Sequence, residues 1–244
     1  MGHADGVTDL RVLRGGESSP TYLLLHGLGA TADVWHGLAG LLGDASWVAP
    51  DLPGHGGSSP LPSYSFAGVA AAVASLIDPR GTVIVGHSFG GVVGLHLAGR
   101  PGVLAVAGLG IKSAWSDEEL AKAAAMAQRP APTYATRAEA AQRHLRVAGL
   151  EGLMFEAPEA AVVETGDGWR PAFDQRAFGV GDPQVDALVA ASPVPVVLAR
   201  GEHDRMVPAS SAPVALPGLG HNAHVEDPGA LLALLSTPPL RPGA

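Results

Sequence analysis

Short runs of consecutive apolar residues recur along the chain and alternate with longer stretches in which apolar and polar residues follow helical spacing. A short run rich in β-branched residues indicates a strand buried on both faces, and the mixed stretches indicate helices packed on it. Such alternation predicts an α/β fold, with a mostly parallel central sheet flanked by helices on both faces. The expected strands are 7–13, 22–25, 47–49, 82–85, 103–108, 195–200 and 213–216, and the expected helices of this core are 35–42, 66–77, 91–98 and 230–236.

This rhythm stops in the middle of the chain, which becomes charged and helical from about residue 112 to residue 190. Ser116 precedes three acidic residues, a typical helix start. Thr136 opens a second helix, expected over 136–148, with Glu139 three residues later, which is the pattern of a capping box. Prolines at positions 130 and 132 separate the two helices.

We therefore expect a helical lid, 112–190, inserted into a core made of 1–111 and 191–244. The alternative is a solvated surface excursion. That alternative would leave several large apolar side chains with only each other to pack on, namely Trp115, Met126, Tyr134 and Phe155. Residues 112–146 also carry six Lys or Arg residues against four acidic ones, an excess that we interpret as helix-surface charge rather than as a site for a substrate carboxylate.

The most specific motif is Gly86-His87-Ser88-Phe89-Gly90, which stands between the apolar run 82–85 and the helix expected over 91–98. A G-x-S-x-G sequence between a strand and a helix is the signature of a nucleophile elbow, a turn so tight that only small residues fit beside the serine. The turn would expose the Ser88 hydroxyl and place the Phe89 N–H at the positive end of the helix, where an oxyanion is stabilised.

A serine hydroxyl becomes a good nucleophile only when a base takes its proton and a carboxylate orients that base. On this type of sheet the acid and the histidine follow the serine in that order. Asp204 lies in a loop directly after the apolar run 195–200, and His221 lies in a glycine-lined loop after the short strand 213–216. We predict Ser88 as nucleophile, His221 as base and Asp204 as the acid that orients it.

Other polar residues near these loops receive a different interpretation. His224 is expected in the first turn of the last helix, where it caps or packs. Asp51 is expected to stabilise its own turn, and Glu202 and His203 to be solvated. His55, in a glycine-rich loop, is expected to fix that loop by hydrogen bonds.

Four blocks of sequence together resemble the α/β-hydrolase superfamily, in particular its serine esterases with a helical lid. They are His26-Gly27-Leu28-Gly29, Asp51-Leu52-Pro53-Gly54-His55-Gly56, the elbow, and the pair formed by Asp204 and His221. The resemblance spans almost the whole chain outside the middle segment. It implies an oxyanion hole formed by the backbone N–H groups of Leu28 and Phe89.

Three further residues are predicted to contact the substrate. They are His26, for which a loop-fixing hydrogen bond is the alternative, His87, for which packing is the alternative, and Trp115 at the start of the predicted lid.

Composition excludes several other chemistries. The 244 residues contain no cysteine, which rules out disulfides, a thiol nucleophile and thiolate metal sites and suits a cytoplasmic protein. The ten histidines form no H-E-x-x-H motif, and neither a Walker loop nor a strand-flanked G-x-G-x-x-G is present, so we expect no metal and no cofactor. A net charge of −8 argues against nucleic acid and anionic membranes as partners. The oligomeric state is left open.

The sequence thus predicts a serine hydrolase that cleaves a small or medium apolar carboxylic ester, or a lactone, through an acyl-enzyme. A carbon–carbon bond hydrolase or pyruvate-eliminating lyase of the menaquinone-pathway type is the main alternative, because the segments 51–58 and 220–224 resemble that enzyme. Its usual arginine past the elbow glycines is replaced here by Val92. A ligand-binding receptor that kept the triad is the third hypothesis.

Overall fold

A single seven-stranded sheet organises the computed structural model, which describes residues 9–241. The strand order is β1-β3-β2-β4-β5-β8-β9, with β1 antiparallel to β3 and every other pairing parallel. This arrangement confirms the predicted fold class. The strands are β1 Val12–Gly15, β2 Ser18–Leu25, β3 Ala45–Pro50, β4 Thr82–His87, β5 Val103–Leu109, β8 Val196–Gly201 and β9 Val214–Leu216.

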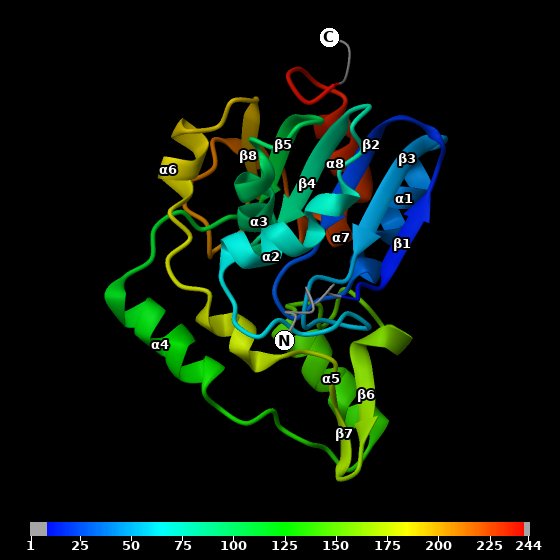
Figure 1. Ribbon diagram of the computed structural model, residues 1–244, viewed down its shortest axis with the longest axis vertical. Helices are drawn as coiled ribbons and strands as arrows, with labels where there is room; N and C mark the ends of the chain where they lie inside the picture. Colours follow the sequence, from blue (N-terminus) through cyan, green and yellow to red (C-terminus); the bar gives the residue numbers. More distant parts are fainter. Residues whose placement is uncertain (1–8, 242–244) are drawn as a thin grey trace, which may run out of the picture.

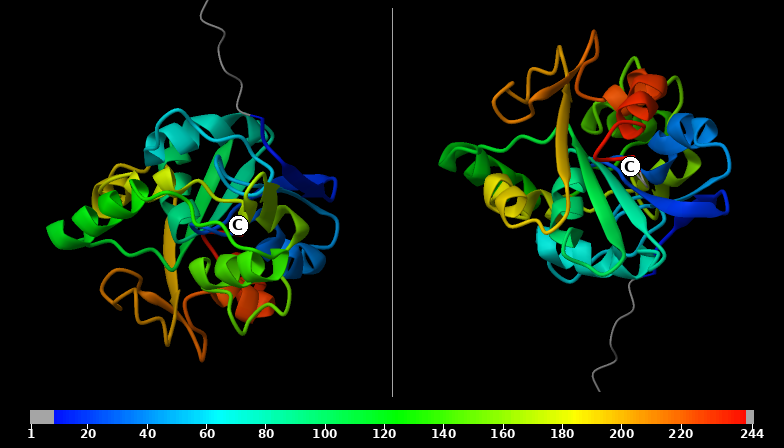
Figure 2. Two further views of the ribbon diagram at one scale, coloured as in Figure 1. Left: turned by 90° about the horizontal axis from the view of Figure 1, so that it is seen from below. Right: turned by 90° about the horizontal axis from the view of Figure 1, so that it is seen from above.

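Helices cover both faces of the sheet (Figures 1 and 2). One face carries α1 His36–Leu41, α7 Ala223–Glu226 and α8 Pro228–Leu235, which contact one another. The other face carries α2 Phe66–Val73, α3 Phe89–Leu97 and α6 Val185–Ala190, where α3 contacts both of its neighbours. Within residues 9–241, no helix combines the length and the apolar character needed to cross a bilayer.

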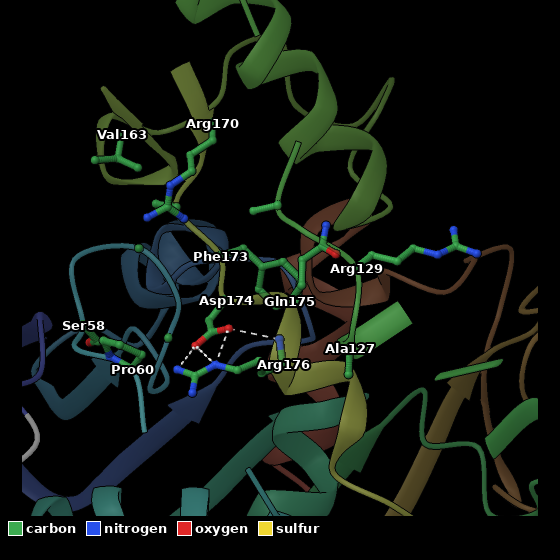
Figure 3. A pocket seen from close by; sticks show the side chains of 14 residues that line it. Ser58, Pro60, Ala127, Arg129, Val163, Arg170, Phe173, Asp174, Gln175 and Arg176 are labelled. Atoms are coloured by element: carbon green, nitrogen blue, oxygen red, sulfur yellow. Dashed lines mark hydrogen bonds and ion pairs between the residues drawn. The ribbon is translucent and has the colours of Figure 1, made fainter. Parts of the chain in front are cut away.

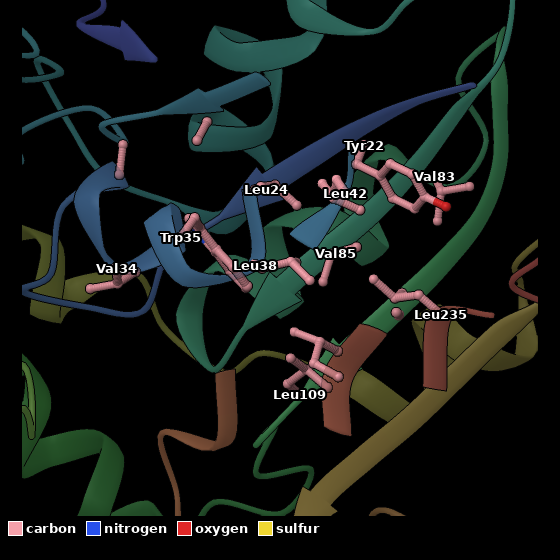
Figure 4. Packing of buried hydrophobic residues seen from close by; sticks show 14 of the residues in the cluster. Tyr22, Leu24, Val34, Trp35, Leu38, Leu42, Val83, Val85, Leu109 and Leu235 are labelled. Atoms are coloured by element: carbon pink, nitrogen blue, oxygen red, sulfur yellow. The ribbon is translucent and has the colours of Figure 1, made fainter. Parts of the chain in front are cut away.

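The two faces bury separate apolar clusters because successive side chains of a strand point to opposite sides. Leu24 and Val85 pack with Trp35, Leu38 and the last helix (Figure 4). Their strand neighbours Leu23 and Ile84 pack instead beneath α2 and α3. The central strands are therefore apolar at nearly every position. This explains why each of them could be recognised in the sequence as a continuous apolar run.

Several predicted elements differ in their bounds. The edge strand expected at 7–13 is β1, Val12–Gly15; residues 7 and 8 of that prediction lie outside the described part of the chain. The helix expected at 35–42 is a 3₁₀ turn, η1 Ala32–Trp35, followed by α1. The helix expected at 66–77 stays α-helical only to Val73 and ends as 3₁₀, η2 Ala74–Leu76.

The segment inserted after β5 contains the two helices that the sequence predicted. They are α4 Asp117–Ala127 and α5 Arg137–Val147, and both begin with a complete capping box, Ser116 with Glu119 and Thr136 with Glu139. The sequence did not predict the hairpin β6 Val162–Thr165 and β7 Gly168–Pro171, or the 3₁₀ turns η3 Glu159–Ala161 and η4 Gln175–Gly179.

This inserted segment lies across the end of the sheet at which the parallel strands finish (Figure 2, left). Gly56 N–H donates to the carbonyl of Ala172, and Asp174 N–H donates to the carbonyl of Gly54, so the hairpin side is tied to the loop after β3. On the α5 side, the Asn222 amide donates to the carbonyl of Gly149.

An ion-pair network fixes the loops that follow β2 and β3. Arg11 contacts Asp33 at 2.8 Å and Asp51 at 3.1 Å, and the Asp51 side chain is fully buried. Asp51 also accepts hydrogen bonds from the N–H groups of Ala32 and Gly57, as expected for a residue that stabilises its own turn. The pKa of Arg11 is raised, mainly by its hydrogen bond to Asp33, against the opposing effect of burial.

We expect Asp51→Ala to lower the free energy of unfolding by about 3–5 kcal/mol, because it leaves two backbone N–H groups without their acceptor and removes one of the two carboxylates that bind the Arg11 guanidinium. Chemical denaturation measures this change. Lys122→Ala is the control, because it breaks an exposed pair with Glu118 and should cost less than about 0.5 kcal/mol. Equal effects of the two substitutions would contradict the assignment of Asp51 to a buried network.

Candidate active site

The turn between β4 and α3 holds Ser88 in a conformation that side-chain-bearing residues rarely adopt. Its φ and ψ angles are 48° and −113°. The residues on both sides of it are buried, whereas Ser88 itself is partly exposed. A strained residue of this kind persists only where the surrounding structure enforces it.

Two close backbone contacts enforce this turn. A Cβ atom on Gly86 would overlap the carbonyl of Gly90, and a Cβ atom on Gly90 would overlap the carbonyls of Leu25 and His26 at the end of β2. Ser88 N–H also donates to the carbonyl of Leu109, the last residue of β5, at 2.7 Å. The serine is therefore fixed between the ends of the two strands that flank β4.

Asp204 and His221 come together as predicted. The Nδ1–H of His221 donates to Oδ2 of Asp204 at 2.8 Å, and Oδ1 of Asp204 accepts from the N–H of Met206 at 2.8 Å. Burial by itself would raise the pKa of Asp204, but the hydrogen bond and charge interaction with His221, together with backbone N–H donors, lower it on balance. The carboxylate is thus ionised and holds the imidazole in the tautomer with a free Nε2.

The loops that carry this pair are joined by close backbone contacts. His203 N–H donates to the carbonyl of Leu219, and a Cβ atom on Gly201 would overlap the carbonyl of Gly220. The spacing between residues 204 and 221 is therefore set by the backbone and not by the side chains alone.

His221 also lies against the end of β5. A Cβ atom on Gly110 would come within 3.2 Å of its ring, and Gly110 directly follows the residue whose carbonyl holds Ser88. Ser88 and the imidazole thus approach two adjacent residues, Leu109 and Gly110 respectively. Among residues 9–241, no hydrogen bond joins Ser88 Oγ to His221. In enzymes without bound substrate, hydrogen bonds between catalytic groups are often long and shorten when substrate binds.

The loop after β2, which contains Leu28, lies directly on the elbow. Gly27 packs against the ring of His87, where a Cβ atom would come within 2.6 Å of Nδ1. The side chain of Leu28 points into the cluster beneath α3, and Phe89 is the first residue of that helix, so its N–H has no partner within the helix.

Two of the residues expected to contact substrate are buried and hydrogen-bonded to backbone groups. His26 is fully buried; its Nδ1–H donates to the carbonyl of Gly27 and its Nε2 accepts from the N–H of Leu52, each at 2.8 Å. His87 is almost fully buried, and its Nε2–H donates to the backbone carbonyl of His221 at 3.0 Å. The contacts of His26 fit the loop-fixing alternative. Nδ1 of His87 has no hydrogen-bond partner among the described residues, so contact of His87 with substrate stays a prediction.

Trp115 is 39% exposed and stands at the start of the inserted segment. Its indole N–H donates to the carbonyl of Lys112, whose ammonium lies over the ring. Nearby, the hydroxyl groups of Ser113 and Ser211 are 2.7 Å apart, which joins this stretch to the loop that follows Asp204. Contact of Trp115 with substrate stays a prediction.

A group of buried, neutral histidines surrounds the site. Burial is the main reason that the pKa is lowered to about 4 for His26 and His144, to about 3 for His55 and His224, and well below 6.5 for His87. His224 lies in the short helix α7, not in the last helix, and packs on Trp35 and His87. The sequence did not predict the burial of His144, which comes from α5. Residues 9–241 hold no group of three acidic or histidine side chains arranged to bind a metal ion.

Because Ser88 is strained, we expect Ser88→Gly to be more stable than Ser88→Ala by about 1–2 kcal/mol, since glycine adopts these angles without a Cβ penalty. Chemical denaturation of both variants measures the difference. Ala98→Gly, at an ordinary helical conformation at the end of the same helix, should be destabilising. If glycine is no better than alanine at position 88, the strain is absent.

The buried histidines make stability fall in acid. Their folded pKa values lie below the unfolded value of about 6.5, so the unfolded chain binds more protons between pH 6.5 and about pH 3–4. The free energy of unfolding should therefore be unaffected by these groups above pH 6.5 and fall below it, by on the order of 1–2 kcal/mol per histidine at pH 5. Denaturation curves at pH 7 and pH 5 measure the loss.

His224→Phe should retain the ring packing and reduce this acid-dependent loss. Val225→Ala in the same helix serves as the control, since it removes packing without removing a titrating group. An equally steep loss in His224→Phe and the wild type would contradict the role of His224.

Comparisons with known proteins identify the family of this chain. The family model described as "Alpha/beta hydrolase family" matches residues 22–234. Lipase LipV of Mycobacterium tuberculosis is 42% identical over 96 residues, a stretch that covers 38% of this chain and 37% of the lipase. The 2-succinyl-6-hydroxy-2,4-cyclohexadiene-1-carboxylate synthase of Yersinia enterocolitica is 28% identical over 241 residues, covering 89% of this chain and 86% of the synthase.

Solved structures agree on the fold. A thioesterase domain from the curacin biosynthetic pathway superposes with a TM-score of 0.76 at 21% identity, over 95% of this chain and 96% of that one. E-2-(acetamidomethylene)succinate hydrolase gives the same TM-score at 23% identity, over 95% of each chain. The family model spans nearly the whole sheet, and the elbow motif is followed along the chain by Asp204 and then His221. The chain therefore belongs to the alpha/beta hydrolase family.

Proposed function

We propose that this chain is a serine hydrolase that cleaves small or medium apolar carboxylic esters, or lactones, through an acyl-enzyme. The observation that carries the proposal is the hydrogen-bonded pair of Asp204 and His221, whose imidazole packs on the same end of β5 that fixes Ser88. A nucleophile, a base and an orienting acid thus come from three separate loops at one edge of the sheet.

In the first step His221 Nε2 takes the proton of Ser88 as the hydroxyl oxygen attacks the ester carbonyl. The backbone N–H groups of Leu28 and Phe89 would hold the developing oxyanion, the second at the positive end of α3. The imidazolium then protonates the departing alcohol. Water, deprotonated by the same histidine, releases the acid from Ser88, while Asp204 stabilises the charged imidazole throughout.

The inserted segment acts in this proposal as the lid. Its hydrogen bonds to the loops after β3 and β9 support that role, because they hold it over the edge where the proposed triad gathers. Two large apolar side chains remain exposed on loops beside the pair, Met206 next to Asp204 and Trp115 at the start of the insertion. Such surfaces favour an apolar acyl or alcohol group.

A second candidate is the carbon–carbon bond hydrolase or pyruvate-eliminating lyase. It is favoured by the match to the Yersinia synthase, which covers most of both chains. Against it, Val92 is buried in the cluster beneath α3, so no cation stands at the position where we expected that enzyme type to hold a substrate carboxylate. Release of pyruvate from the pathway intermediate, without ester cleavage, would reverse our ranking.

The test is an activity screen over p-nitrophenyl esters of increasing chain length, lactones and thioesters, together with labelling by a fluorophosphonate. We expect turnover of short or medium esters, and Ser88→Ala should lower kcat by about 10³-fold or more and abolish labelling. Ser113→Ala, which removes a partly exposed hydroxyl from the insertion, should retain both properties.

Turnover in Ser88→Ala similar to that of the wild type would overturn the proposal. Labelling of Ser88 with no turnover of any ester, lactone or thioester would instead favour the receptor hypothesis.

A further inference from the structure

A cleft of about 390 Å³ lies between the inserted segment and the loop after β3, apart from Ser88, Asp204 and His221 (Figure 3). Its size falls within the range of sites for small molecules. The lining is mostly small or apolar, but three arginines interrupt it, which is unusual in a chain of net charge −8. The arginines are Arg129, Arg170 and Arg176.

Arg176 is already neutralised. Its side chain binds the carboxylate of Asp174 through three hydrogen bonds, donates to the carbonyls of Leu61 and Pro62 and lies over the ring of Tyr64. Asp174 also accepts from the hydroxyl of Tyr64. Among residues 9–241, Asp174 is the only acidic residue that lines the cleft, and both of its oxygens are bonded to Arg176.

Arg170, unlike Arg176, lines the cleft without a counterion among the described residues. It is partly buried on β7, and within residues 9–241 no carboxylate lies within ion-pair distance of it. The hairpin sets its direction: Trp169 and Val162 pack on the α5 side, whereas Arg170 and its cross-strand partner Val163 occupy the other face and line the cleft. Figure 3 shows its guanidinium turned towards the space above Phe173 and Asp174.

The cleft adjoins the proposed catalytic centre through aromatic rings. Phe173 forms its floor and packs on His55 at 4.9 Å between ring centroids, and His55 in turn packs on Phe89 at 6.1 Å. Phe89 directly follows the nucleophile. The cleft therefore lies two ring contacts away from the residue that follows the nucleophile.

We propose that this cleft binds an anionic group, a carboxylate or a phosphate, through Arg170, with the adjoining apolar lining receiving the carbon chain that bears it. Arg129 also lines the cleft, but its guanidinium extends away from Arg170 (Figure 3). The inference rests on the proposed function in one respect: it assigns the anion to the part of the ester remote from the bond that is cleaved.

The test compares two esters of similar length, p-nitrophenyl pentanoate and the mono-p-nitrophenyl ester of glutaric acid, which adds a terminal carboxylate. Arg170→Met keeps the aliphatic stem and removes the charge. It should raise KM for the glutarate ester about tenfold or more, as expected for loss of a charge-assisted hydrogen bond, and leave the pentanoate within about twofold.

Arg137→Met is the matched control, because it removes an exposed arginine from the same inserted segment outside the cleft. It should leave both esters within about twofold. An equal effect of the two substitutions would show that the change in KM comes from the lower net positive charge and not from Arg170 in the cleft. That result would overturn the site.

Binding is measured independently of turnover by titrating Ser88→Ala with glutarate and with inorganic phosphate in a calorimeter. A heat of binding that disappears in the Ser88→Ala/Arg170→Met double variant supports the site. The anion that binds more tightly shows whether the site prefers a carboxylate or a phosphate. If neither ester is cleaved but an anion binds through Arg170, the proposed function fails and the site stands. If both esters are cleaved with no dependence on Arg170 and no anion binds, the site fails and the function stands.

Discussion

The rest of the site depends on one close approach between backbones, the contact of Gly90 with the carbonyls that end β2. No side chain fits there, so α3 begins directly against its neighbouring strand and Ser88 is forced into a positive φ. This contact brings the loop containing Leu28 onto the elbow. It also fixes Ser88 against the carbonyl of Leu109, and His221 lies against Gly110 at the same end of β5. The geometry of Ser88 is therefore a property of the sheet and not of its own loop.

The loops around the elbow are held by polar groups that have been taken out of water. Asp51 joins two loops through Arg11 and through backbone N–H groups, and His26 joins the same loops through both ring nitrogens. Nitrogens of His55, His144 and His224 are buried without any partner among the described residues. Unpaired buried nitrogens cost stability, and evolution retains such costs most often near functional sites. The result is an uncharged, rigid surrounding for His221, the histidine that gains a proton in the proposed mechanism.

Much of this could be predicted from local sequence. The buried strands were legible because both of their faces are apolar, and the elbow because glycine is the only residue that its contacts allow. The capping boxes of α4 and α5 depend on residues three apart, which is within reach of a sequence pattern. Asp204 and His221 were placed by their order after strands rather than by any signal of their own.

What sequence could not provide are features that depend on distant partners. The hairpin of β6 and β7 has four-residue strands in which Trp169 faces α5 and Arg170 faces the cleft, so no apolar run marks it. The pairs of Arg11 join residues 22 and 40 positions apart, and nothing local distinguishes them from surface charges. The burial of His144 and His224 comes from packing against other elements, and a histidine looks the same in sequence whether buried or solvated.

The short helix α6 has a practical consequence for anyone who wishes to exchange the insertion between proteins of this fold. By sequence it belongs to the segment 112–190, but Val185 is fully buried in the cluster beneath α3 and so serves the sheet. A chimaera joined at residue 190 would import a foreign core helix together with the rest of the insertion. A junction a few residues before Val185 would transplant the earlier part of the insertion alone and leave the host's hydrophobic interior intact.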